Sequence, residues 1–148
     1  MNVNVKEYME REFELLQKRV QDVAKAYEHQ DPTKTMAESL QMFDAFKRFF
    51  ALEDFIFSKL RTNAAMQPVI KCFLDERREI REMLEDLLML HVSEPDFMKG
   101  IHHVVEHSKK HLDFVHKELH PKVVDALSPE DWTYLNESFD DRLHKVPF

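Results

Sequence analysis

The chain of 148 residues contains a single glycine, Gly100. β-Hairpins depend on tight turns that favour glycine, and a glycine-rich phosphate-binding loop needs more than one. Hydrophobic residues make up 43% of the chain and charged residues 33%, which suits long amphipathic helices joined by short turns. The scarcity of glycine therefore predicts an all-α protein, and 148 residues are enough for one domain with a substantial core.

Apolar residues recur at steps of three and four along four long segments, which is the spacing of an amphipathic helix. Prolines separate the segments, because proline cannot continue a helix and the residue before it avoids the helical region. The predicted helices run from about Val3 to His29, Pro32 to Arg61, Pro68 to His91, and Pro95 to Pro121, where Pro121 either ends the helix or kinks it before Val123–Leu127. We expect an up-down-up-down four-helix bundle over about 3–127 and a short fifth helix over about 128–144, in one domain of 1–148.

The chain carries a net charge of −7 and has a pI of about 5.7. This acidity argues against nucleic-acid binding, which needs a basic stripe on the surface. The N-terminal residues are polar and no apolar run reaches membrane length, so we expect a cytoplasmic protein that does not bind membranes. The lone Cys72 cannot form an intramolecular disulfide, and its apolar neighbour Phe73 suggests a buried thiol.

Six of the nine histidines lie between Ile101 and Val123. When this segment is plotted as a helix at about 100° per residue, the apolar stripe is flanked by His111 on one side and His116 on the other. The other four histidines are predicted to face solvent: His102, His103, His107 and His120. Similar plots of the other helices place a few polar residues inward or at the border of the core: Glu12, Glu53 and Arg77.

Four local patterns, together with the order and length of the helices, resemble the hemerythrin family of HHE cation-binding domains. The patterns are EFELL from Glu12, FFALED from Phe49, ERREIREML from Glu76, and HLDFVHKELHP from His111 to Pro121. The resemblance implies a four-helix bundle that holds two oxygen-bridged irons, and a role in binding or sensing iron or oxygen. Glu53 and His111 match the family's ligand types, whereas Glu12 and His116 are replacements that can still coordinate a metal.

Three arrangements of this core remain open. Glu12, Glu53, His111 and His116 could hold one ion, iron or zinc, at about 2.0–2.2 Å. Alternatively, Arg77 occupies the place of the metal and bridges Glu12 and Glu53, because unpaired buried carboxylates are costly and a guanidinium pairs with them bidentately. The third arrangement is an intact two-metal site in another register. A slip of one residue in the third helix exchanges Arg77 for Glu76 or Arg78 at the inner position.

The sequence therefore leaves two functions in view. The first is a non-enzymatic, hemerythrin-like protein that binds a metal ion or a small diatomic ligand. The second is a metal-free interaction or regulatory module, for which a homodimer formed through an apolar helix face is one form. No arrangement of nucleophile and base indicates an enzyme of the hydrolase or transferase kind.

Overall fold

A computed structural model of the chain describes residues 4–139. Within this range the regular structure is entirely helical, as the sequence predicted. The long helices are α1 (Val5–Glu28), α2 (Pro32–Phe57), α3 (Gln67–Leu88) and α4 (Pro95–Phe114). The shorter elements are the 3₁₀ turn η1 (Ala64–Met66), the π-helical turn η2 (Val115–Leu119), α5 (His120–Ala126) and α6 (Pro129–Ser138).

Side-chain caps set several helix starts. The Asn4 side chain accepts a hydrogen bond from the Glu7 backbone N–H, and Asp31 caps α2 ahead of Pro32 in the same way. The predicted start of the first helix at Val3 lies outside the described residues. The second helix was predicted too long, because α2 ends at Phe57, four residues before Arg61. After it the chain forms turns, and the Ser58 hydroxyl donates to the Phe55 carbonyl at 2.6 Å.

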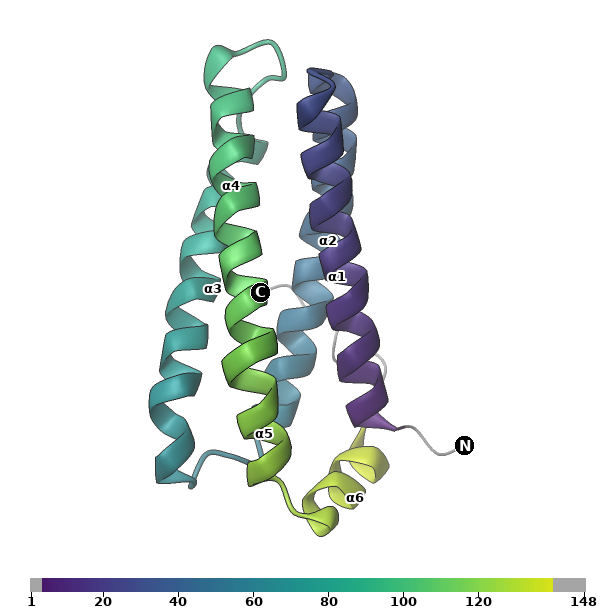
Figure 1. Cartoon of the computed structure of the whole chain (residues 1–148), viewed down its shortest axis with the longest axis vertical. Coiled ribbons are helices and arrows are strands. Elements are labelled where there is room, and N and C mark those ends of the chain that lie inside the picture. Colours follow the sequence, from purple (N-terminus) through teal and green to yellow (C-terminus); the bar gives the residue numbers. More distant parts are fainter. Residues whose placement is uncertain (1–3, 140–148) are drawn as a thin grey trace.

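Each long helix runs antiparallel to the one before it (Figure 1). The closest packing joins α1 with α2, α1 with α4, and α3 with α4. Their apolar faces form one continuous core cluster, to which α2 contributes the fully buried Phe46, Phe49 and Phe50. This aromatic helix is therefore buried over a broad arc.

The fourth long helix continues without a break from α4 through η2 into α5. Inside η2 the His120 backbone N–H donates to the Val115 carbonyl, five residues earlier. Such a π-turn holds one residue more than an α-turn, so every later side chain is rotated back by about 100°. Pro121 follows at once and has no N–H to donate to the carbonyl four residues before it. The wider turn thus lies where an α-helix would in any case lose a bond.

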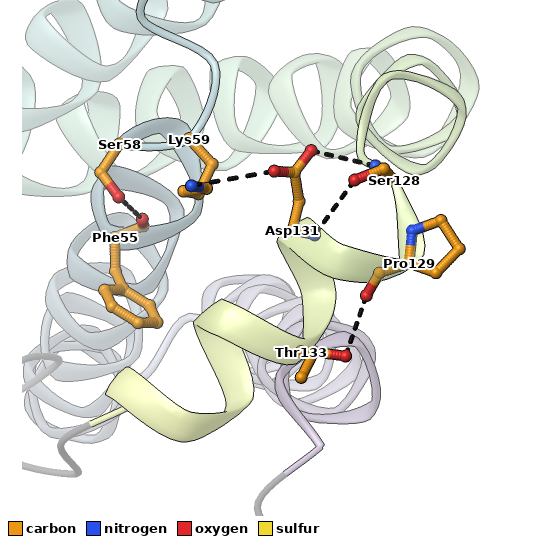
Figure 2. Close-up of polar contacts among 7 residues, drawn as sticks. All are labelled: Phe55, Ser58, Lys59, Ser128, Pro129, Asp131 and Thr133. Carbon is orange, nitrogen blue, oxygen red and sulfur yellow. Dashed lines mark hydrogen bonds and ion pairs between the residues drawn. The ribbon is translucent and has the colours of Figure 1, made fainter.

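The short helix α6 closes the lower end of the molecule in Figure 1. Its N-terminus carries a capping box in which Ser128 Oγ accepts from the Asp131 N–H at 3.1 Å, and Asp131 Oδ2 accepts from the Ser128 N–H at 3.0 Å (Figure 2). Leu135 is fully buried, and Asn136 Oδ1 accepts from the Val5 N–H at 2.8 Å. The predicted fifth helix is confirmed over Pro129–Ser138, while residues 140–144 lie outside the described range.

Cys72 is exposed, so the prediction of a buried thiol was wrong. Its neighbour Phe73 is fully buried, and adjacent residues on a helix point about 100° apart, which turns Cys72 outward. Partial loss of water and the carboxylates of Glu76 and Asp75 raise the pKa of this thiol. Among the described residues, no helix is both long and apolar enough to cross a membrane.

Candidate functional site

Glu12 is buried on α1, as predicted, and its partner comes from α2. Arg48 Nη2 donates to Glu12 Oε1 at 2.7 Å. The other carboxylate oxygen, Oε2, is buried without a partner, as is Nε of Arg48. Arg48 keeps 40% of its side chain exposed, so it reaches a buried carboxylate from the edge of the helix pair.

Glu53 is fully buried on α2, and His120 at the start of α5 binds it. His120 Nε2 lies 2.8 Å from Glu53 Oε1, while Glu53 Oε2 is buried without a partner. The prediction that His120 faces solvent was wrong, because its side chain is only 13% exposed. In an uninterrupted helix it would lie about 180° from His111, but the π-turn rotates it back to about 80°, the centre of the apolar stripe.

His111 is buried on α4, and Glu76 on α3 is its polar partner. The Nδ1–Oε2 distance is 2.6 Å, and because a carboxylate only accepts, Nδ1 donates this bond. The imidazole packs among aromatic rings, with centroid distances of 5.8 Å to Phe50 and 5.1 Å to Phe73. Its Nε2 atom is buried without a partner.

Arg77 does not neutralise the two buried glutamates, contrary to the prediction. Arg77 Nη1 donates to Asp54 Oδ1 at 2.7 Å, and the guanidinium lies 5.3 Å from the centroid of the Phe50 ring. Arg48 and His120 take the role that was assigned to Arg77. The register of the third helix explains the difference, since Glu76, one residue earlier, is the side chain that reaches His111.

His116 is exposed, and none of the buried pairs includes it. It stacks on Phe13 of α1 with a centroid distance of 5.9 Å, whereas His120 meets the same ring edge-on at 5.7 Å. The predicted ligand set of Glu12, Glu53, His111 and His116 is therefore not brought together. Within residues 4–139, no three His, Cys, Asp or Glu side chains are grouped so that they could hold a metal ion.

The residues present do not fit a two-iron centre. Each of the three buried ligand candidates already bonds to a partner within the chain, and one of those partners is the permanently charged Arg48. A guanidinium beside Glu12 would repel a nearby cation. Phe49, where the family resemblance implies an imidazole, is fully buried and packs 6.2 Å from the Phe73 ring.

The sequence did not predict the three partners, namely Arg48, Glu76 and His120, although Glu76 was named as one alternative to Arg77 at the inner position of the third helix. Two of them carried a readable signal, because antiparallel helices joined by a short turn pair residues at equal distances from that turn. Glu12 and Arg48 each lie 18 positions from Gln30, and Glu76 and His111 lie 17 and 18 positions from Ser93. His120 had no such signal, since its position depends on the π-turn.

A groove runs along α1 where it faces α4, η2 and α5. It consists of two adjoining cavities of about 560 and 380 Å³, which share Phe13, Gln17 and His116. His120 also lines the larger cavity, so the buried Glu53–His120 pair lies directly behind it. The groove and this pair together form the candidate functional site.

Comparison of the chain with models of protein families, with curated proteins and with solved structures finds no match.

Proposed function

We propose that this chain is a non-enzymatic, hemerythrin-like bundle of the up-down-up-down type that works without a metal, as an interaction or regulatory module. The observation that carries the proposal is the pairing of every buried ligand candidate with a side chain of the same protein. Glu12 bonds to Arg48, Glu53 to His120, and His111 to Glu76.

The energetics of burial support a metal-free core. A carboxylate removed from water needs a compensating donor or cation, and a bound metal is one way to provide it. Arg48 supplies a permanent charge to Glu12, and the imidazole of His120 supplies a donor to Glu53. An ion entering this region would have to displace both bonds before it could use the same oxygens.

The competing proposal is a single iron or zinc ion in the same core. Three buried atoms of the predicted ligand residues lack a partner and favour it, namely Glu12 Oε2, Glu53 Oε2 and His111 Nε2. Buried polar atoms of this kind call for an explanation, and an ion or an ordered water is one. The alternative needs at least one further ligand to approach them.

Metal analysis of protein purified without a histidine tag, after growth with added iron and zinc, tests the proposal. We expect well under one ion per chain and no change in melting temperature on adding either metal. His103 is exposed and His107, one helical turn later, is half-buried, and this pair can bind zinc adventitiously, so H103N/H107N protein is measured alongside. One ion per chain that persists in H103N/H107N but is lost in Glu53→Gln would overturn the metal-free proposal.

A further inference from the structure

We propose that the groove along α1 binds a small organic molecule with a primary ammonium group and an elongated apolar body. The inference rests on the proposed function, since it names the ligand of a module whose core holds no metal. The two cavities lie within the range of about 300–1,000 Å³ that is usual for small-molecule sites.

The groove exists because α1 packs closely on α4 but little on η2 and α5. Its lining on α1 extends from Lys6 to Gln21, which corresponds to about 22 Å of helix. Apolar side chains form the floor over this length: Met9, Phe13, Val20, Leu112, Pro121 and Val124. A long apolar body fits such a floor better than a compact polar solute does.

The charges of the larger cavity favour a cation. Three carboxylates line it, from Glu10, Glu14 and Asp125, against one ammonium, from Lys6. Within residues 4–139 none of these three carboxylates forms an ion pair. Glu10 and Glu14 also lie four residues apart on one helix face, where like charges repel each other. A bound cation would relieve that repulsion.

The charges of the smaller cavity are already satisfied. Asp113 pairs with Lys117 at 3.0 Å, and Lys109 lies 3.8 Å from Glu106. The two ends of the groove therefore differ, with unpaired negative charge beside α5 and internally paired charge beside α4. This asymmetry orients the ligand, placing its head group in the larger cavity and its apolar body toward Val20 and Leu112.

His120 favours a head group that carries N–H donors, of which a primary ammonium has the most. Its Nε2 bonds to the Glu53 carboxylate, which only accepts, so in the neutral imidazole Nδ1 is left as an acceptor. His120 lines the larger cavity, and Nδ1 is not among the buried atoms without a partner. An ammonium N–H can donate to this nitrogen, whereas a quaternary ammonium has no N–H to offer.

Isothermal titration of the full-length chain with four probes tests the assignment: octylammonium, octyltrimethylammonium, octanoate and methylammonium, all below micelle-forming concentrations. We expect saturable binding of octylammonium, about tenfold weaker binding of octyltrimethylammonium because a hydrogen bond is lost, and no measurable binding of the other two. NMR signals of Phe13, His116 and His120 should shift only with the binding probes. Octanoate binding as tightly as octylammonium, or no probe binding at millimolar concentration, would overturn the assignment.

Variants locate the binding within the groove. Gln17 is exposed and lines both cavities, so Gln17→Trp should fill the groove and abolish binding, while Gln41→Trp on the exposed face of α2 should not. E10Q/E14Q should weaken octylammonium binding at least fivefold, and Glu28→Gln on the same helix should leave it unchanged. Binding unaffected by Gln17→Trp refutes the site. The metal content of the same protein is measured separately, so a metal-free chain that binds no probe refutes this inference alone.

Discussion

Arg48 reaches Glu12 from the rim of the α1–α2 pair, so the guanidinium is partly hydrated while the carboxylate it binds is buried. The carboxylate has given up its water and depends on that one partner for its charge. The arginine, by contrast, keeps 40% of its side chain exposed and would remain partly solvated if Glu12 were neutral. The two residues therefore contribute unequally to stability. Removing Arg48 should lower the free energy of unfolding by a different amount from removing Glu12.

Replacing Arg48 tests this inequality. Arg48→Met should lower the free energy of unfolding by about 2 kcal/mol, because it leaves Glu12 buried without a cation. Glu12→Gln in the Arg48→Met background should recover about half of that loss. Urea unfolding of the four proteins of this cycle measures both effects. Lys47→Met is the matched control, because Lys47 lies 3.9 Å from the exposed Asp44, and its loss should cost less than about 0.5 kcal/mol.

Single residues show how far the sequence could predict the site. The apolar periodicity placed Glu12, Glu53 and His111 inward or at the border of the core, and all three are buried, because burial of a helix face depends mainly on spacing. Their partners were harder to predict, because the partner of a residue depends on the axial register of two packed helices. The periodicity of one helix carries no information about that register. For this reason the sequence pointed to Arg77 rather than Arg48, whereas in the structure Arg48 binds Glu12 and Glu76, beside Arg77, binds His111.

Among the elements, the π-turn η2 most affects the candidate site, because it decides which histidine faces the core. Without the additional residue, His120 would face solvent and Glu53 would lose its donor. Local propensities do not reveal such a turn, since VHKEL is compatible with an ordinary α-helix. Pro121 is the one sequence signal nearby, and it predicts a helix end or a kink rather than a rotation.

Deleting one residue from the π-turn should restore an α-helix without moving His120. We compare a variant that combines deletion of Lys117 with Pro121→Ala against Pro121→Ala alone. Their free energies of unfolding should differ by less than about 1 kcal/mol, because the deletion removes only an exposed lysine and its ion pair with Asp113. Deletion of Lys109 in the same background should cost more than about 3 kcal/mol, since it rotates the buried His111 and Leu112 out of the core. Thermal unfolding compares the variants, and equal losses would contradict the role given to η2.

The packing of α6 against the bundle should depend on pH through the carboxyl group of Asp131. The Ser128 N–H, the Ser128 hydroxyl and Lys59 lower the pKa of this carboxyl (Figure 2). Because the folded pKa lies below the unfolded value of about 3.9, the stabilisation is complete above that value and is lost as pH falls through the folded pKa. Trp132 fluorescence should therefore change on acidification below about pH 4. In Asp131→Asn protein much of this acid-induced fluorescence change should be absent, whereas Glu130→Gln, in the same turn, should show the full change.

On the scale of the whole molecule, the fold was more predictable than the site. A single glycine, prolines at the helix starts and the three-to-four spacing of apolar residues agree with one another, and such agreement specifies helices and their approximate ends. Side-chain pairing and the π-turn emerge only when the helices are placed against each other. This is why the all-α class was predicted correctly while the bonds of His120 and Arg77 were not.

The continuity of the core predicts how the molecule unfolds. Residues from α1 through α6 belong to one buried cluster, in which Leu135 of α6 is as fully buried as Val5 of α1. We therefore expect a single cooperative transition, in which helical circular dichroism and fluorescence of the only tryptophan, Trp132, change at the same urea concentration. An earlier transition of the fluorescence alone would show that α6 melts separately and that the chain is not one folding unit.

The π-turn also affects how this chain can be aligned with other proteins. From Val115 onward the sequence is one residue out of frame with an uninterrupted helix, although the chain remains helical on both sides. An ungapped alignment that matches His111 with a residue of an uninterrupted helix would therefore pair every residue after η2 with the wrong structural position. A correct alignment needs a one-residue insertion inside a helix, where alignment methods usually penalise gaps most heavily. A motif defined by residue spacing is displaced by one residue in the same way if it extends across η2.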